Sequence, residues 1–543
     1  MNTKNDFYSI VEEVTEKRVK YHDLYEIAAY LESVGWNDRR AFAAYGFNNI
    51  FEMAQQVFDI VDSKTSVSTY VPPEKLNIFN FIINSIKNFF RGLIFALPMA
   101  ISVVSMLTLR FSLWSYENLT TDLATSIAVG TILSFMTVGG FTQAIARRGF
   151  FYIIMGYYNM ARKVTFSFIK IGYVTIFTFA LLLLAISYIF SFFPMKMLLI
   201  AILYYIFLSS IWLSVTVMYI LRKEFAFTGL IAFGIVLVGF LFLIMDINII
   251  VSQLISLVVV TILCLLLVIY FFHKAELKME KGLSPKMPKL SVTFYTVVPY
   301  FLYGFSYFTF LYTDRVIAWS ANDSSNMPYI IWFRGAYELG LDFALFTLII
   351  PTGVIEVVVY SIMKQLELQI KNFTLYNTNE LNNLFKKKYT KNLFITIVVS
   401  LLSGVFIYLL LLYIDKNYSA VLRFSIAENP TILFVFTCSI IAYSILAVGL
   451  MNSVLLFSLS QPKIINKALG ASLAINIGVG FIGSRWFSWM QNNLWNNVPF
   501  HGIEGYAFAI CGLLAGSIYF MIKSTKTVYE VFDHLDYYLY AMS

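Results

Sequence analysis

From residue 92 onward the chain alternates between long apolar runs and short polar segments. Several runs, such as 249–272, reach the roughly 18 apolar residues that mark a helix able to cross a bilayer. Backbone groups in lipid must bond within their own segment, so runs of about 20 residues predict helices and not barrel strands. About twelve spans are expected, at 92–116, 121–146, 165–190, 197–221, 226–246, 248–272, 291–317, 336–360, 393–414, 430–458, 464–484 and 502–522.

The basic residues between these runs alternate in number from loop to loop. Loops on the N-terminal side of the predicted spans hold 21 Lys and Arg residues, whereas the opposite loops hold 5. Positive charge is retained on the cytoplasmic face of a membrane protein. We therefore expect a multi-pass protein of the cell (inner) membrane, with an even number of spans and both termini in the cytoplasm.

The predicted spans fall into two halves of six. Each half opens with a helix that contains a proline and then an arginine: Pro98 and Arg110, then Pro299 and Arg315. With six spans each, the halves share one orientation and are related by an axis along the membrane normal. The expected fold class is an all-α polytopic membrane protein with two six-helix lobes and a small N-terminal module. Expected boundaries are 1–64 for the module, 65–91 for a linker and amphipathic segment, 92–272 for the first lobe, 273–290 for an inter-lobe loop, 291–522 for the second lobe and 523–543 for the C-terminal tail.

The first 64 residues are polar and have apolar positions at helical spacing, such as Ile27, Ala28 and Leu31. The segment Gly35–Asp38 is typical of a helix end followed by a new N-cap. We expect a cytoplasmic helical module that docks a partner protein or a regulator. The alternative is a folding aid or lid packed on the membrane domain.

Composition supports the membrane class and argues against enzymes. The chain is 59% hydrophobic and 13% charged, and its net charge of +8 lies mostly in loops, which topology explains without nucleic acid. Cys264, Cys438 and Cys511 all lie in apolar runs, which indicates buried thiols. No Gly-Lys dipeptide or Asp-x-Asp pair is present, and the four histidines are scattered. We predict no enzyme, no cofactor and no bound metal.

Charged residues inside apolar runs are costly in lipid and usually face a cavity or a partner. Spans one, seven and eight and their ends hold nearly all of them: Arg110, Asp314, Arg315, Arg334, Glu338, Asp342 and Glu356. This concentration predicts a central polar cavity that serves as a translocation cleft and binds substrate or ions. Glu338 and Asp342 are four residues apart and share a helix face, which Arg334 extends. Glu356 has a simpler alternative role, pairing with Lys364.

We expect four of these residues, Arg110, Asp314, Arg315 and Asp342, to form one network lining the cleft. The favoured pair is Arg110 with Asp342, across the two halves. Asp314 with Arg315 is the alternative, although adjacent residues point about 100° apart on a helix. Simpler roles also stay open: residues near the outer surface snorkel to water, and the Arg110–Asp342 pair is a salt bridge without a transport role.

Two stretches resemble the MOP flippase superfamily, which includes MATE exporters, lipid-linked oligosaccharide flippases and the Pel exopolysaccharide transporters. The first, 122–163, contains the sequence SFMTVGGFTQ at 134–143 and is similar to the family's second helix and the basic segment after it. In the second, 303–351, the element 314–319 is similar to Asp-Lys-Trp-x-x-Trp of the Pel transporters, and 341–351 to a Tyr-Asp stretch that runs into a proline. The departures are Arg315 for Lys, Val316 for an aromatic residue and Leu341 for Tyr, and the N-terminal module has no counterpart.

The resemblance, closest to the Pel transporters, implies two lobes in a V that alternate access to a central cleft. It implies a flippase or transporter for an exopolysaccharide or its lipid-linked precursor, acting with separately encoded synthase or glycosyltransferase subunits. The arginines on both halves favour an anionic or pyrophosphate-linked cargo. The alternatives are a MATE-like exporter of small cations coupled to Na+ or H+, a non-transporting scaffold of a glycan synthase, and a membrane-embedded transferase.

Overall fold

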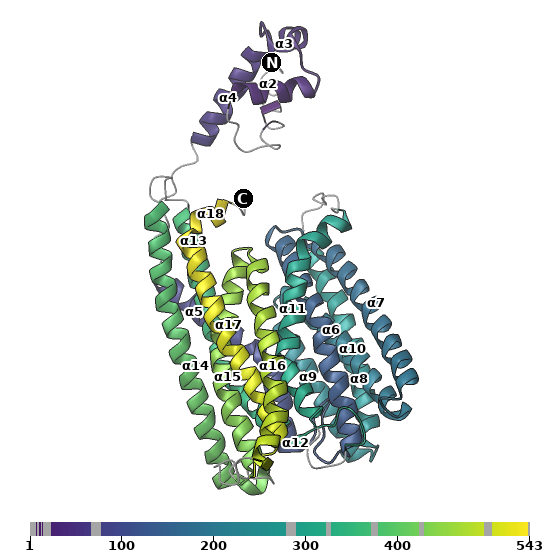
Figure 1. Cartoon of the computed structure of the whole chain (residues 1–543). Helices are drawn as coiled ribbons and strands as arrows, with labels where there is room; N and C mark the ends of the chain where they lie inside the picture. The colour runs from purple at the N-terminus through teal and green to yellow at the C-terminus, as the bar shows by residue number, and fades with distance from the viewer. Residues whose placement is uncertain are drawn as a thin grey trace. The chain divides into compact units, whose positions relative to one another are not determined.

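The structure is a computed structural model, and it describes residues 7, 10–11, 14, 23–66, 78–277, 289–321, 327–370, 378–422, 428–493 and 502–540. These residues are helical, apart from turns, loops and one isolated bridge between Phe111 and Tyr116. The chain divides into two compact units, residues 1–81 and residues 82–543 (Figure 1). The predicted all-α class is therefore confirmed for the part of the chain that the structure describes.

Among the described residues, the smaller unit includes α2 (Leu24–Ser33), α3 (Asp38–Tyr45) and α4 (Ile50–Ser66). The helix start predicted near Asn37 is confirmed, because its side chain accepts a hydrogen bond from the Arg40 backbone N–H at 2.9 Å. Leu31 of α2 and Val57 of α4 are among the buried residues of a small apolar core. This core belongs to the unit itself.

The larger unit begins within α5, a long helix whose first residues, 78–81, belong to the smaller unit. Its helices are α5 (Ile78–Leu109), α6 (Thr121–Ile154), α7 (Tyr158–Phe190), α8 (Met195–Ile220), α9 (Glu224–Gly239), α10 (Ile249–Glu276), α11 (Leu290–Trp319), α12 (Gly335–Leu345), α13 (Ile349–Ile370), α14 (Thr378–Leu422), α15 (Pro430–Ser458), α16 (Pro462–Asn493), α17 (Ile510–Asp533) and α18 (Leu535–Tyr540). The π-helix Phe240–Ile244 extends α9, and the 3-10 turn Phe346–Leu348 joins α12 to α13.

Ten helical segments of the described chain are long and apolar enough to cross a membrane, and α5 makes eleven if its two bent halves count as one span. The halves of α5, 81–94 and 96–109, meet at 44°. Pro98 explains the bend, because it has no N–H to bond the carbonyl four residues earlier. The predicted seventh span, α11, is a 30-residue helix, but its five tyrosines and two charges keep it below that apolarity. The multi-pass class is confirmed, and a count of twelve stays a prediction.

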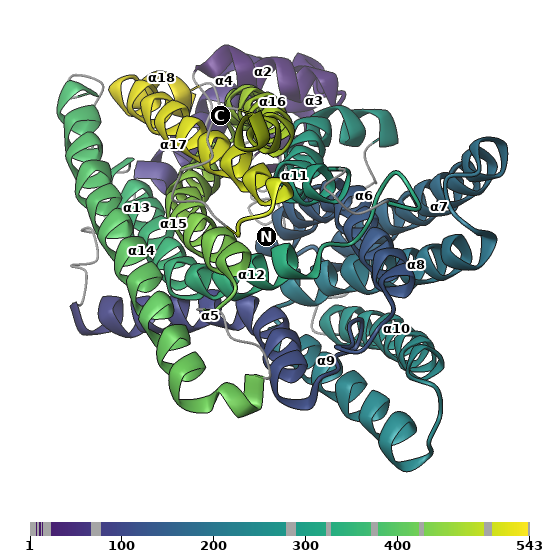
Figure 2. The same cartoon turned by 60° about the horizontal axis from the view of Figure 1, so that its bottom comes forward.

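Two apolar cores divide the larger unit into lobes. One core draws its residues mostly from α6 to α10 and from the segment after α5, and the other mostly from α11 to α18. Figure 2 shows α6 to α10 gathered on one side and α13 to α17 on the other, with α11 and α12 between them. We call residues 82–277 the N-lobe and residues 289–540 the C-lobe.

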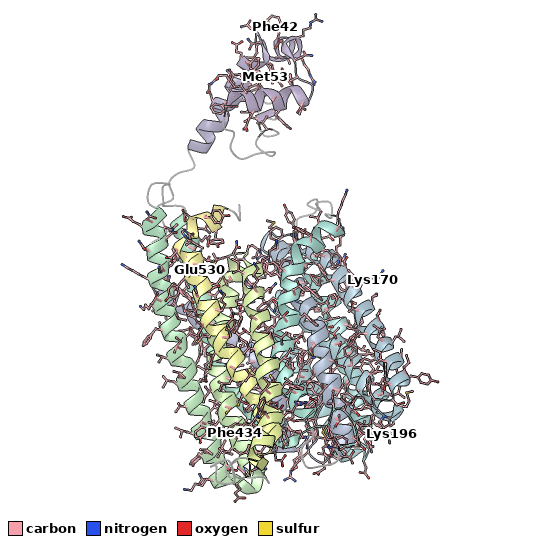
Figure 3. The ribbon with its side chains drawn as sticks, viewed as in Figure 1. Phe42, Met53, Lys170, Lys196, Phe434 and Glu530 are labelled. Carbon is pink, nitrogen blue, oxygen red and sulfur yellow. The ribbon has the colours of Figure 1, made fainter. Side chains whose placement is uncertain are left out.

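Helices of the larger unit run alternately in opposite directions, so the segments rich in Lys and Arg gather at one end. We call it the basic end; Arg147 and Arg222 lie there. Figure 3 shows Glu530 toward this end and Lys196 and Phe434 toward the other. The side of the membrane that the basic end faces stays a prediction.

The lobes are in close contact at two glycine pairs. A Cβ atom added at Gly304 of α11 would collide with the carbonyl oxygen of Gly139 of α6. A Cβ atom at Gly92 of α5 would lie 2.7 Å from the Cα atom of Gly353 of α13. Small residues allow such backbone contact between membrane helices. The inter-lobe interface is therefore built on α6 with α11 and on α5 with α13.

Candidate functional site

The end of α11 and the start of α12 bring four charged side chains together. After α11 the chain turns back, and the Trp332 backbone N–H donates to the Trp319 carbonyl at 2.9 Å. Gly335 then begins α12, which places Glu338 in the first turn, where the helix dipole favours a carboxylate. We call Asp314, Arg315, Glu338 and Asp342 the acidic cluster.

Arg315 is the centre of the acidic cluster. Its Nη1 atom donates to the Glu338 carboxylate, and its Nη2 atom donates to Asp342 Oδ1 at 3.3 Å. The guanidinium carbon also lies 5.3 Å from the ring centroid of Tyr312, within the range of a cation–π interaction. One guanidinium therefore joins two carboxylates from successive turns of α12, as their spacing of four residues allows.

Neutral donors hold the carboxylates from the other side. The Trp319 indole N–H donates to Glu338 Oε1 at 3.0 Å, and the Tyr337 hydroxyl donates to Asp314 Oδ2 at 2.8 Å. The other oxygen of Asp314, Oδ1, is buried without a hydrogen-bond partner among the described residues. The cluster is thus fixed by hydrogen bonds but leaves one buried acceptor unused among the described residues.

The accessibility of the cluster falls in steps from Asp342 to Asp314. The Asp342 side chain is 43% exposed, those of Arg315 and Glu338 are each 9% exposed, and Asp314 is fully buried. Three carboxylates face one guanidinium, so with all groups ionised the cluster has two negative charges in excess. Such an excess inside a membrane helix bundle is costly. The arrangement favours uptake of a cation, through an accessible outer carboxylate toward a buried inner one.

Arg110 does not join this cluster, so the expected pair with Asp342 is wrong. Helix α5 ends at Leu109, and Arg110 has a positive φ of 69° at the turn that follows. Its carbonyl accepts from the Glu117 N–H at 3.0 Å, and its guanidinium lies 3.6 Å from the Glu117 carboxylate. A local turn therefore removes Arg110 from the predicted span 92–116 and gives it a nearby partner.

Arg334 also departs from the expected stripe. It precedes the first residue of α12, so it does not share a helix face with Glu338. Its Nη2 atom donates to the Ala321 carbonyl at 2.9 Å, and its guanidinium carbon lies 4.7 Å from the Tyr506 ring centroid. Arg334 therefore stabilises the connection before α12. Arg315, not Arg334, is the arginine that pairs with Glu338 and Asp342.

Glu356 belongs to a different charged group at the basic end. It interacts electrostatically with Arg91 of α5 and with Glu224 of α9, which form an ion pair at 3.0 Å. The alternative of a pair with Lys364 is wrong, since that ammonium bonds Glu367 at 3.1 Å. We call Arg91, Glu224 and Glu356 the crossing group. The sequence prediction missed Arg91 and Glu224 because both lie at the edges of predicted spans.

Sequence reasoning also missed the asparagine amides that bond between helices of the C-lobe. The side chain of Asn476 in α16 donates to the Phe310 carbonyl of α11 at 2.9 Å, and Asn466 donates to the Pro299 carbonyl at 2.7 Å. Asn452 of α15 accepts from the Tyr389 hydroxyl at 2.7 Å. Asparagine inside an apolar run was an available signal, since such side chains bond across membrane helices. The bonds of Asn466 and Asn476 attach α11 to α16 within the C-lobe.

The site has no group of three or more His, Cys, Asp or Glu side chains placed to hold a metal ion, and neither has the rest of the described chain. No protein-family model matches the sequence, and no curated protein sequence matches it. Solved structures do match. A mutant of the Vibrio cholerae MATE transporter VcmN is 12% identical, with a TM-score of 0.55, and the match covers 83% of this chain and 98% of that one.

The bent form of the same transporter gives a TM-score of 0.53 at 12% identity, covering 83% of this chain and 99% of that one. The chain has the fold of the MATE transporters. A MOP superfamily transporter from Pyrococcus furiosus, described as having a binding pocket of reverse polarity, is 15% identical with a TM-score of 0.51, covering 82% and 96%. The MATE-like fold expected from the resemblance is thereby confirmed. The narrower likeness to the Pel transporters stays a prediction.

Proposed function

We propose that this chain is a membrane transporter that moves its cargo by alternating access between the two lobes, driven by uptake of a cation at the acidic cluster. The observation that carries the proposal is the cluster itself. The cluster holds three carboxylates, of which Glu338 and Asp342 bond the single guanidinium of Arg315, and their exposure falls from Asp342 to Asp314. Binding of a cation would lower the negative charge of the cluster, so the cation-bound and cation-free forms would differ in energy. Coupled transport needs two such states.

A proton suits the cluster better than Na+. Sodium needs several oxygen ligands around one point, whereas a proton needs one carboxylate oxygen. Asp314 and Glu338 each bond a different aromatic donor, Tyr337 and Trp319. Asp314 Oδ1 is the buried carboxylate oxygen of the cluster that has no partner among the described residues, so we assign the inner proton to Asp314.

For the cargo we propose a glycan or a lipid-linked glycan. The support is the likeness of the element 314–319 to that of the Pel transporters, together with its place at the cluster, where Trp319 bonds Glu338. The earlier preference for an anionic cargo loses support, because Arg110 and Arg315 are bound to carboxylates and Arg334 to a carbonyl and a ring.

A second candidate is an exporter of small organic cations coupled to protons. The observation that favours it is the excess of carboxylates at the acidic cluster, which attracts a positively charged cargo. The two candidates share the mechanism and differ in what moves. A non-transporting scaffold would have neither the cation-coupled mechanism nor a cargo.

Purified chain in liposomes tests the proposal. Two probes are offered under an imposed pH gradient: a fluorescent lipid-linked sugar and ethidium. We expect gradient-dependent movement of the sugar probe, lost in Asp314→Asn and kept in the matched control Glu117→Gln, an exposed carboxylate outside the cluster. Movement of ethidium alone supports the second candidate. If neither probe moves in the wild type, the chain is a scaffold and the proposal is wrong.

The smaller unit has a separate proposed role, as the docking site of a synthase subunit. Its surface exposes the ring pair Tyr25 and Phe51, 68% and 44% exposed, with centroids 6.0 Å apart. Removing residues 1–66 is expected to leave liposome transport unchanged and to lower glycan output in cells. Tyr25→Ala with Phe51→Ala is expected to reproduce the loss without removing the unit. Normal glycan output in both variants would contradict the docking role.

A further inference from the structure

The crossing group lies where a helix of one lobe passes over a helix of the other. Gly92 of α5 and Gly353 of α13 touch through their backbones, and the Thr352 hydroxyl lies 3.4 Å from the Gly92 carbonyl oxygen. Arg91 directly precedes Gly92, and Glu356 lies one turn after Gly353. The two charges therefore flank the contact point, one on each lobe.

In the present structure Arg91 has its ion-pair partner within its own lobe. Its Nε atom lies 3.0 Å from Glu224 Oε1, and the two side chains are 30% and 10% exposed. Glu224 is the first residue of α9. Glu356, on the C-lobe, interacts electrostatically with both residues, and Tyr219 of α8 interacts with all three. These four titratable groups interact with one another at the crossing.

The geometry leaves the arginine free to take a second carboxylate. Arginine has five N–H donors in a planar fork, and the pair with Glu224 uses Nε alone. Its two terminal nitrogens match a carboxylate edge, and Glu356 is an exposed carboxylate of the other lobe. A small rotation about the glycine contact changes the distance from Arg91 to Glu356 but not the distance to Glu224, since α5 and α9 belong to one lobe.

We infer that Arg91 is an ion-pair switch between the lobes. It binds Glu224 when the lobes separate at the basic end, and it is shared with or passed to Glu356 when they close there. Glu356 thus stabilises the closed basic end, and Glu224 competes with it. The inference rests on the proposed function, because only a chain whose lobes move has use for the switch.

Distances between spin labels at the basic end test the switch in the full-length protein. Lys163→Cys of the N-lobe and Lys463→Cys of the C-lobe are exposed label sites near their helix starts. They are introduced after replacement of Cys264, Cys438 and Cys511. The readout is the ratio of the long-distance population to the short-distance population in nanodiscs.

The variants are expected to move this ratio in opposite directions. Glu356→Gln removes the attraction across the lobes and should raise the ratio about fivefold or more, the usual size of coupling between two states. Glu224→Gln frees Arg91 for Glu356 and should lower the ratio. Glu367→Gln, a matched exposed control on the same helix, should leave it unchanged. In an Arg91→Gln background, Glu356→Gln should have no further effect.

The outcomes separate this inference from the proposed function. A single unchanging distance in every variant means that the lobes do not move, and it overturns both. If two populations are seen but Glu356→Gln does not change their ratio, the switch alone is wrong. The same holds if Glu224→Gln and Glu356→Gln shift the ratio in the same direction. If Glu224→Gln does not fold, the Arg91→Gln background decides: an effect of Glu356→Gln that persists there refutes the switch.

Discussion

Replacing Arg315 with glutamine removes the one positive charge of the acidic cluster while keeping most of the side-chain volume. Glu338 then loses the guanidinium that neutralises it, and its remaining donor is the neutral indole of Trp319. We expect a marked loss of stability, caused by the burial of a carboxylate without compensation and not by a cavity.

The exposed fractions of the side chains set the size of the effect. Arg315 and Glu338 are each 9% exposed, and removing one partner of such a buried pair costs about 3–5 kcal/mol. Asp342 is 43% exposed, so it is much less buried than Glu338 and its pairing contributes about 1 kcal/mol or less. For a unit the size of residues 82–543, the usual unfolding entropy per residue converts 1 kcal/mol into about 1 °C of Tm. The expected fall is therefore about 3–5 °C.

Thermal unfolding of the purified protein in detergent, followed by tryptophan fluorescence, measures this fall. Arg162→Gln is the matched control, because that arginine is 43% exposed, and its ion pair with Glu276 should cost about 1 °C or less. The double variant Arg315→Gln with Glu338→Gln should recover at least half of the loss. The reasoning fails if Arg315→Gln costs no more than the control, or if Asp342→Asn costs as much as Arg315→Gln.

Three further variants separate the parts of the site. Asp314→Asn should abolish gradient-driven transport in liposomes without lowering Tm, because the carboxylate that it removes is buried and forms no ion pair among the described residues. A lower Tm would show that Asp314 has a structural role instead. Arg110→Ala should leave transport within about twofold of wild type, since its partly exposed pair contributes about 1 kcal/mol at most, and loss of transport would contradict its placement outside the cluster. Gly304→Ala should lower both Tm and transport because the added methyl meets the Gly139 carbonyl, whereas Gly478→Ala, with open space around it, should change neither; equal behaviour of the two would refute the inter-lobe contact.

Sequence patterns predicted the helices where one physical requirement sets them. The span expected at 291–317 is helix α11, Leu290–Trp319, and the one expected at 430–458 is α15 with the same bounds. Apolar length and internal hydrogen bonding determine such a segment locally. The predicted lengths are wrong where a helix is longer than its apolar run. The span expected at 393–414 is part of α14, whose 45 residues measure about 68 Å at the usual rise, more than twice the apolar thickness.

The residues of the acidic cluster were all among the charged residues predicted for the site, but the sequence predicted only part of their arrangement in space. The spacing of Glu338 and Asp342 correctly placed them on one face, because helical periodicity is local. Their shared partner, Arg315, depends on the angle at which the chain returns from α11 to α12, which no spacing encodes. Arg110 was misplaced because a turn, held by its carbonyl bond to Glu117, ends α5 inside an apolar run.

Helix α11 links the acidic cluster to the lobe interface, and this gives the proposed transport cycle a physical path. Its last turns contain Asp314 and Arg315, and its middle meets α6 through Gly304. The amides of Asn466 and Asn476 bond its backbone at two levels, so α11 moves with the C-lobe and not against it. A change in the charge of the cluster therefore acts on a rigid element that is also one side of the inter-lobe contact. Coupling between two sites needs such an element, with an equilibrium that both sites bias. If α11 is that element, weakening its attachment to α16 should uncouple proton uptake from lobe movement while leaving both processes in place.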